Sequence, residues 1–470
     1  MLPTTRKSVR SVCFSSAVFL AGCVLLLYAC TPKTTQKKLP VENIEPFSVE
    51  GTEAIPDLWW TSFNDVQLDS LVQTALDKNF NLKTFQYRVL ESQALVKSQR
   101  SFLFPDLEAQ IQSSFNRPQP DFVGGENVQL GLSSFYQLDL WGRLHALTDA
   151  ERFRAEATVN DYRAATLSLS ARVAGTWYQL LAARQRLLLV EQQIANNEQT
   201  LQFIKAQFGS GQIRSVDILR QEQLLKGSEQ QKVNIESQIA VLEHQLSVLL
   251  GQPAQNGITY VADSFPEIPP LPEAGLPADL ISRRPDIQRT FQQLQATDRE
   301  VAAAISNRYP RISFNTSIQL RANSFESLLN DWAYSLGGNL VAPLFRAGQL
   351  KAEVSRTKAV KNAALYDYGQ TVLIAFQEVE DALIQEQKQR EQLTVLQEQL
   401  ELAGQSVQQL RYEYFNGLTD YLGVLTALRQ EQQLQQDVLN ANLNLIQFRI
   451  ALYSALAGGF ETPALPQSES

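Results

Sequence analysis

Apolar residues recur at heptad spacing through the central part of this sequence, from Val159 to Phe208. Every seventh position, and a second series three residues after it, is mostly apolar, as in helices that pack by coiled-coil geometry. No proline lies between Pro120 and Pro253. The pattern therefore predicts one helix from about Leu144 to Phe208, which would be roughly 100 Å long at a rise of 1.5 Å per residue.

The same pattern returns about 206 residues further along the chain, where Leu393 and Val407 correspond to Leu187 and Leu201. The turns that follow the two stretches are also similar, and so are two proline-containing segments upstream. The matched segments are Phe208-Gly209-Ser210-Gly211 with Tyr414-Phe415-Asn416-Gly417, and Leu103-Phe104-Pro105-Asp106-Leu107 with Arg308-Tyr309-Pro310-Arg311-Ile312. These matches indicate an internal duplication of nearly the whole mature chain, and its long period excludes a solenoid of short repeats.

Four shorter segments alternate with a period of two, as strands with two different faces do. They cover residues 107–116, 128–138, 312–320 and 332–340. In the first of them, Leu107 and Ile111 face one way and Gln110 and Gln112 face the other. Each segment is about ten residues long, which is the length that a tilted strand needs to cross a bilayer. A small soluble sheet with one buried face would alternate in the same way.

The number of strands favours the membrane over the soluble sheet. Four strands cannot close into a barrel, and open edges are not tolerated in lipid. Three copies would supply twelve strands, an even number within the range of outer-membrane barrels. We therefore predict a mostly α protein with a membrane β-barrel. A duplicated unit of helical hairpin and strand pair would form a trimeric 12-stranded β-barrel and a long α-helical coiled-coil barrel.

The amino terminus reads as an export signal. Three positive residues precede an apolar run from Val12 to Ala29, and a cysteine follows it. We predict a signal peptide over residues 1–29 that is removed when Cys30 is lipidated. Cys23 is the alternative lipidation site, because Leu20-Ala21-Gly22 before it matches a bacterial lipobox more closely by residue type. An uncleaved anchor is the other alternative, since the run is near the minimum for a membrane span.

Composition argues against several other classes of protein. The formal net charge is -8 and charges of both signs are mixed along the chain, so no nucleic-acid surface is expected. All three cysteines lie within the first 30 residues, and His145 and His244 are the two histidines. No nucleophile motif, phosphate-binding glycine loop or metal-ligand spacing is present. We therefore predict that the protein is not an enzyme and needs neither a metal nor another cofactor.

The remaining boundaries follow from proline content and helical periodicity. We expect a lipid anchor and extended tether over residues 30–57, a first repeat over 58–251, a linker over 252–285, a second repeat over 286–458 and a polar tail over 459–470. A continuous helical pattern from Leu58 to about Phe104 ends at Pro105. Return helices are expected from about Ile213 to Leu250 and from about Leu422 to Leu456.

Two stretches of the sequence carry a resemblance to a known family. The segment from Gly275 to Ile287, which contains Arg283-Arg284-Pro285-Asp286, resembles the inter-repeat signature of the TolC-type outer-membrane factors. The motif that begins at Trp59-Trp60 and continues through Phe63 and Asp65 resembles the amino terminus of their lipoprotein branch, which serves tripartite efflux pumps. The resemblance covers roughly residues 41–460, and the duplication, the strand pairs and the lipobox occur in the expected order.

The resemblance implies a homotrimer in the outer membrane of a Gram-negative bacterium, anchored by lipid and extending into the periplasm. The trimer would be a passive duct that exports small molecules. It would receive them from an inner-membrane transporter of the RND type, to which a periplasmic adaptor protein joins it. The alternative is a non-channel periplasmic coiled-coil lipoprotein, such as an adaptor or a structural protein.

The resemblance also implies functional residues at the two hairpin turns. Adaptor docking is expected at the exposed tips, formed by Gly209, Ser210, Gly211 and Gln212 in the first hairpin and by Asn416, Gly417, Leu418 and Thr419 in the second. In relatives, inward-facing aspartates just beyond the second tip narrow the aperture of the channel and attract cations. They act as a ring of charges that gates the channel. Thr426 and Gly423 stand at those positions here, so the gate candidates are Asp420, Tyr421 and Asp217. An ordinary turn residue or helix cap is the alternative role for Asp420.

Overall fold

The computed structural model of the 470-residue chain describes residues 46–48, 51, 56, 58–116, 125–211, 213–254, 265–273, 277–322 and 328–456. The predicted lipidation sites Cys30 and Cys23, the predicted signal peptide and polar tail, and the tip residue Gln212 lie outside these ranges. The elements in chain order are a 3-10 helix η1 (Trp59–Phe63), α2 (Val66–Lys78), α3 (Phe80–Ser101), β1 (Glu108–Asn116), β2 (Gly125–Leu138), α4 (Arg143–Gly209), α5 (Ser215–Leu249), α6 (Pro277–Arg283), α7 (Pro285–Ser306), β3 (Arg311–Ala322), β4 (Trp332–Val341), α8 (Gln349–Phe415) and α9 (Tyr421–Leu456).

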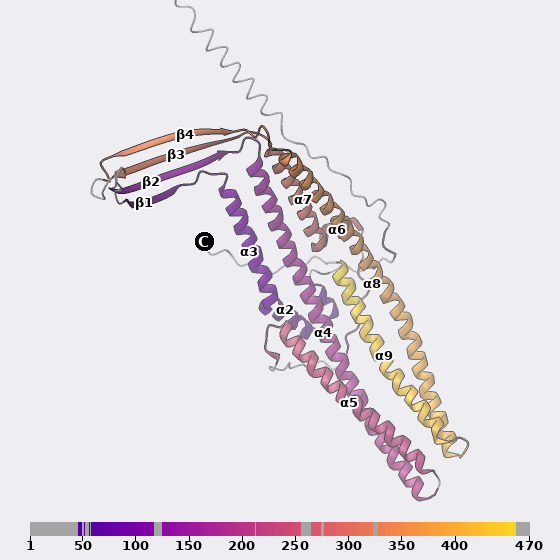
Figure 1. The fold of residues 1–470 in the computed structure, drawn as a ribbon. Helices are drawn as coiled ribbons and strands as arrows, with labels where there is room; N and C mark the ends of the chain where they lie inside the picture. The colour runs from indigo at the N-terminus through magenta and orange to yellow at the C-terminus, as the bar shows by residue number, and fades with distance from the viewer. Residues whose placement is uncertain are drawn as a thin grey trace, which may run out of the picture. The chain divides into compact units, whose positions relative to one another are not determined.

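The two long helices predicted from the heptads are confirmed. Helices α4 and α8 each contain 67 residues, and α5 and α9 return beside them as antiparallel partners (Figure 1). Most of the heptad positions of α4 are buried, among them Val173, Leu180, Val190 and Ile204. The equal length of α4 and α8 follows from the duplication of the sequence. None of the helices within the described residues is long and apolar enough to cross a membrane.

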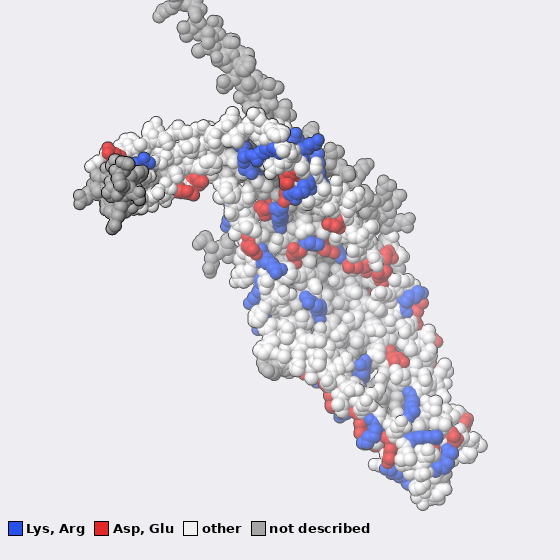
Figure 2. All heavy atoms as spheres, in the orientation of Figure 1, with Lys and Arg blue, Asp and Glu red and all other residues white. Residues whose placement is uncertain are grey.

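The strands form one antiparallel sheet in the order β1-β2-β3-β4. The pairing places Ala109 opposite Leu132, Leu132 opposite Ile318 and Ile318 opposite Tyr334, so the apolar positions of all four strands share one face. Large side chains on that face are exposed, with Leu336 72% and Trp332 68% accessible. Figure 2 shows few charged side chains over the sheet, whereas both signs are interspersed over the helices. The opposite face is mostly polar.

The helical pattern before Pro105 is divided into three elements, which corrects the prediction of one continuous stretch. Asp65 interrupts it because its side chain accepts hydrogen bonds from the backbone N–H groups of Gln67 and Leu68, which makes it the N-cap of α2. Asn79 interrupts it again, since its Oδ1 accepts from the N–H of Leu82 at 3.0 Å at the start of α3. Capping side chains, rather than a loss of apolar periodicity, set these boundaries.

The contacts of the chain divide it into two compact units that cut across the duplicated halves. One unit contains residues 91–157 and 290–368, which include the sheet. The other contains the described residues within 41–90, 158–289 and 369–456, which include the parts of both hairpins next to their turns. Each half of the sequence therefore contributes to both units. The segment predicted as a linker also contains the short helix α6, and α7 begins at Pro285.

The second unit is centred on the aromatic motif near the amino terminus. Trp59, Trp60 and Phe63 are at most 2% exposed and pack with residues of α4, α5 and α9. The indole of Trp59 stacks on the ring of Tyr453 and donates to Ser170 Oγ at 3.1 Å. The segment that precedes α2 is therefore fixed against helices from both halves of the sequence.

A buried arginine holds part of the linker in the same unit. Arg449 of α9 is 0% exposed, and its guanidinium donates to Glu386 Oε2 at 2.9 Å and to Oε1 at 2.6 Å. It also donates to the carbonyl oxygens of Pro269 and Pro270. Burial alone would raise the pKa of Glu386, but the bonds and charges of Arg449 and Arg390 outweigh it and hold this pKa below its usual value.

We expect Glu386→Gln to lower the free energy of unfolding by about 3 kcal/mol, because it leaves the charge of Arg449 buried without a counter-charge. Thermal or denaturant unfolding of the detergent-solubilised protein near pH 7 measures this. Glu391→Gln is the control, since Glu391 pairs with Lys388 on the exposed surface and should change stability by less than about 1 kcal/mol. The stability that Glu386 contributes should disappear as the pH falls through its lowered pKa, below about 4.5, because the wild-type side chain is then also neutral. Equal effects of the two substitutions at pH 7 would contradict the role of Glu386 as the buried counter-charge of Arg449.

Candidate functional site at the hairpin ends

Glycines in the left-handed region form both hairpin turns. Helix α8 ends in a Schellman motif, in which the N–H of Leu418 bonds to the carbonyl of Glu413 at 2.9 Å and the N–H of Gly417 bonds to that of Tyr414 at 3.0 Å. Gly417 has a φ of 74°, which suits a residue without a Cβ atom. In the first hairpin, Gly211 has a φ of 76° and bonds to the carbonyl of Phe208. The similar turn sequences therefore produce similar turns.

A small apolar cluster joins the two hairpins just behind these turns. Its buried members are Ile204, Tyr421, Val424 and Leu425, which come from α4 and α9. Partly buried residues of α5, α8 and the turn before α5 surround them: Ile213, Ile218, Leu224, Leu410 and Tyr414. The ring of Tyr414 lies 5.5 Å from that of Tyr421, measured between centroids. Packing across this cluster holds the ends of the two hairpins together.

A chain of buried polar side chains continues from this cluster into the first hairpin. The hydroxyl of Tyr421 donates to Gln221 Oε1 at 2.7 Å, and Gln221 Nε2 donates to the carbonyl of Asn197 at 2.9 Å. Asn197 Nδ2 in turn donates to Ser228 Oγ at 3.2 Å. Burial, aided by Tyr414 and Asp217, raises the pKa of the Tyr421 hydroxyl well above its usual value, so Tyr421 remains a hydrogen-bond donor at neutral pH.

Charged residues surround the turn between α4 and α5. Asp217 lies in the first turn of α5, where the helix dipole favours a carboxylate, and its side chain is 5% exposed. Arg214 and Arg220 flank it, with nitrogen–oxygen distances of 3.5 and 3.4 Å. Arg214 also lies 4.0 Å from Asp420 Oδ2 of the second hairpin. Arg214 and Asp420 occupy equivalent positions of the duplication, 206 residues apart, so the two repeats carry opposite charges at the same place.

The structure brings the three gate candidates to one end of the hairpins but gives them different surroundings. Tyr421 and Asp217 are buried, whereas the side chain of Asp420 is 58% exposed. Asp420 Oδ1 accepts from the N–H of Gly423 at 3.2 Å, so Asp420 is an N-cap of α9, which is its alternative role. Sequence reasoning missed Gln221 and Arg214, and only the second could have been found, from the opposite charges at equivalent repeat positions.

The predicted tip residues are mostly exposed. Gly209, Ser210 and Gly211 of the first turn and Asn416, Gly417 and Leu418 of the second are exposed, and Thr419 is partly buried. Large apolar side chains lie among them, with Leu418 73%, Phe415 60% and Phe208 45% accessible. The turns therefore present a mixed apolar and polar surface. Within the described part of the chain, no group of three or more His, Cys, Asp or Glu side chains is placed to hold a metal ion.

Side-chain bonds join the two helices of the first hairpin and also join the two hairpins to each other. Within the first hairpin, Lys205 pairs with Glu222 at 2.8 Å and Lys232 pairs with Glu191 at 2.7 Å, in both cases joining α4 to α5. Contacts between the hairpins include four bonds between neutral side chains, at Gln193–Gln435 (2.9 Å), Gln207–Tyr414 (3.1 Å), Gln231–Gln436 (3.2 Å) and Gln221–Tyr421, and one bond from the guanidinium of Arg186 to Asn440 Oδ1. The ion pair Arg214–Asp420 at the turns is long and exposed. Neutral bonds of this kind contribute about 1 kcal/mol each.

The sequence matches a family model described as outer membrane efflux protein over residues 71–252 and 276–458. Among curated proteins, the pyoverdine export outer membrane protein OpmQ of Pseudomonas aeruginosa is 28% identical, over 94% of this chain and 97% of that protein. The cation efflux system protein CusC of Escherichia coli K12 is 26% identical, over 95% and 98%. Among solved structures, the outer-membrane channel OprN has a TM-score of 0.83 with 26% identity, and it covers 92% of this chain and 99% of that one.

We expect Tyr421→Phe to weaken the contact between the hairpins by about 1–3 kcal/mol, because it leaves Gln221 Oε1 buried without its donor while the ring still packs. Hydrogen exchange of the backbone amides at the two turns measures the effect as faster local opening. Tyr412→Phe is the matched control, since Tyr412 is on α8 in the same hairpin and is 64% exposed. Unchanged exchange in Tyr421→Phe would show that the buried hydroxyl does not hold the hairpins together.

Proposed function

Because this chain belongs to the outer membrane efflux protein family and is an outer-membrane efflux channel, not an enzyme, we propose that three copies form a passive duct. The family predicted from the resemblance is confirmed, and the channel is favoured over the non-channel lipoprotein. The duct would be a 12-stranded β-barrel that continues as a barrel of α-helices. One observation carries this proposal, namely a four-stranded sheet with an exposed apolar face and two free edges.

The sheet supports closure by further copies of the same chain. Strands β1 and β4 are the edges, and each pairs on one side only. Lipid does not satisfy free backbone groups, so such edges are stable in a membrane only when another strand pairs with them. Pairing β4 of one copy with β1 of the next would repeat the antiparallel order of the sheet. The exposed apolar side chains would then face lipid, and the polar face would line the lumen.

We expect Leu336→Arg to reduce the amount of protein in the outer membrane, because a charge on the lipid-facing side of a barrel costs about 2–4 kcal/mol near the bilayer midplane. Ser335→Arg is the matched control, since Ser335 is the preceding residue of β4 and faces the polar side. Outer-membrane fractions and heat-modifiable trimers on detergent gels give the readout. Equal tolerance of both substitutions would contradict the assignment of the two faces.

The hairpin tips are the proposed docking surface for the other parts of a tripartite pump. A periplasmic adaptor with a helical coiled coil would seat against the six tips of a trimer, where Phe208, Phe415 and Leu418 offer apolar contacts among polar residues. The inner-membrane transporter would be of the RND type and would deliver the cargo. The two curated relatives are named for pyoverdine export and cation efflux, so we propose export of small molecules without assigning one cargo.

The membrane attachment of the proposed trimer has a second part. Cys30, with Cys23 as the alternative, would carry the lipid that anchors the chain to the outer membrane of a Gram-negative bacterium. The tether after Cys30 would lead from the lipid to the motif at Trp59, which is fixed in the core of the second unit. Lipidation would therefore add an anchor to each of the three copies.

We propose that the gate lies where the two hairpins meet, at Asp420, Tyr421 and Asp217. The buried bond from Tyr421 to Gln221 and the ion pair from Arg214 to Asp420 both join the second hairpin to the first. Asp217 Oδ2 lies 3.5 Å from Nε of the same arginine, Arg214. Movement of the second hairpin away from the first would break these contacts and widen the inner end of the duct. The aspartates of three copies would form a ring of negative charges at this end, which would favour the passage of cations, as charged rings in other channels do.

We expect the purified trimer to conduct weakly in planar bilayers, and we expect conductance to rise several-fold in the double variant Asp420→Ala, Tyr421→Phe. Both changes remove bonds between the hairpins and leave the apolar cluster in place. Lys226→Ala is the control, because Lys226 pairs with Glu229 within α5 and not across the hairpins. Unchanged conductance would place the gate elsewhere. No conductance from protein shown to be folded and trimeric would overturn the duct.

A further inference from the structure

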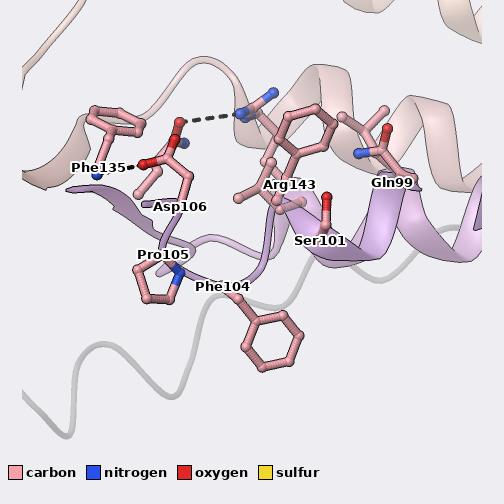
Figure 3. Close-up of a pocket in the computed structure, with 11 residues that line it drawn as sticks. Gln99, Ser101, Phe104, Pro105, Asp106, Phe135 and Arg143 are labelled. Atoms are coloured by element: carbon pink, nitrogen blue, oxygen red, sulfur yellow. Dashed lines mark hydrogen bonds between the residues drawn. The ribbon is translucent and has the colours of Figure 1, made fainter. Parts of the chain in front are cut away.

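A pocket lies in the first unit where the sheet meets the helices. It has a volume of about 550 Å³, which is within the range of sites for drug-sized molecules. Residues from the end of α3, the beginning of β1, the end of β2 and the first turns of α4 line it. Figure 3 shows Phe135, Asp106 and Arg143 along one side of the pocket. None of the proposed gate or docking residues belongs to it.

Arg143 is the positive charge in this pocket, and its guanidinium group is only partly hydrogen-bonded. Its Nε atom is buried without a hydrogen-bond partner in the described part of the chain, and its contact from Nη2 to Gln137 Oε1 is long, at 3.4 Å. No carboxylate among the described residues forms an ion pair with it. Asp139, the nearest acid along the chain, accepts from both the backbone N–H and the ring of His145.

The position of Arg143 is electrostatically unfavourable in three further ways. It is the first residue of α4, where the helix dipole disfavours a cation. Partial burial and the neighbouring charge of Arg311 lower its pKa, and together they outweigh the charge of Asp139, which raises it. An arginine side chain nevertheless stays protonated in proteins, so it cannot relieve the strain by losing its proton. A bound anion would offset all three costs at once.

The sheet contributes an unusual apolar residue to the same pocket. Phe135 lies on the polar face, because the pairing places Ser133 beside Glu108 and Gln137 beside Ser313 on that side. It is the aromatic residue of that face among the strand side chains that the structure describes, and it is 49% exposed. Its backbone is fixed at the edge of the pocket, since its N–H donates to Asp106 Oδ1 at 2.6 Å.

We propose that this pocket binds an organic acid, with one negatively charged group at Arg143 and an apolar ring or chain against Phe135. The pocket opens on the face of the sheet that would line the duct, so the site rests on the proposed function and would hold cargo in transit. Phe102, Leu144 and Leu147 extend the apolar lining and favour an organic anion over an inorganic one. Asp106 in the same wall disfavours a second negative charge on the ligand.

The test uses naphthalene-2-sulfonate as the probe and the full-length trimer in lipid nanodiscs, with empty nanodiscs to subtract partition into lipid. Equilibrium dialysis should show saturable binding to the wild type. Arg143→Gln should weaken this binding about tenfold or more, since a hydrogen bond to a charged group is lost. Arg143→Lys should retain part of it, and naphthalene-2,6-disulfonate should bind more weakly than the monosulfonate.

Arg152→Gln is the matched control, because Arg152 is on α4 in the same unit, is exposed, and does not line the pocket. Its binding should equal that of the wild type. Phe135→Ser tests the apolar side separately and should also weaken binding of the probe, even if the Arg143 variants fold poorly. Unchanged binding in both Arg143→Gln and Phe135→Ser would overturn the site.

Absence of saturable binding to the wild type would also overturn the site. Side chains of a neighbouring copy that filled the pocket would give this result. The conductance of the same preparations separates this proposal from the duct. A conducting trimer that does not bind the probe contradicts the site alone. A folded trimer that does not conduct contradicts the duct.

Discussion

The two free edges of the four-stranded sheet are the constraint on which the rest of this structure depends. Strands β1 and β4 each leave one row of backbone groups unpaired, and the apolar face beside them is exposed. In lipid, each unpaired group would cost several kcal/mol. Within the chain, the pairing of β2 with β3 joins the first repeat to the second. Pairing of β4 with β1 of another copy would join the second repeat to the first in the same antiparallel manner, so the duplication makes a closed ring of repeats possible.

The duplicated halves share their geometry and differ in their chemistry. Helices α4 and α8 have the same length, and both turns use a glycine with positive φ. Charges at equivalent positions are nevertheless opposite, since Arg214 corresponds to Asp420 and Asp106 corresponds to Arg311. The first pair meets between the hairpins at 4.0 Å. Divergence at Arg214 and Asp420 therefore gives the two repeats complementary charges at their turns, where they form a long, exposed ion pair.

The strength of the contacts changes along the hairpins. Near one end of α9, Arg449 and Glu386 form a buried, fully hydrogen-bonded pair that also holds the linker at Pro270. A buried pair of this kind is costly to break. At the turns, the contacts are single neutral hydrogen bonds, a small apolar cluster and an exposed ion pair that contributes less than about 1 kcal/mol. The buried pair fixes α9 to α8 and to the linker within the second hairpin, whereas the contacts at the turns join the second hairpin to the first.

The sequence by itself determined the elements and their kinds. A heptad repeat fixes which side of a helix is buried, and alternation fixes which side of a strand is apolar, so α4, α8 and all four strands followed from local periodicity. The sequence pattern did not reveal that Asp65 and Asn79 divide the first helical stretch, because a cap depends on one side chain reaching particular backbone groups. Only the tertiary structure paired Tyr421 with Gln221, 200 residues earlier, and brought the end of α3 beside Arg143 at the start of α4. Such contacts join segments that are distant in the sequence. The periodicity of one segment does not specify which residue of another segment its side chains will contact.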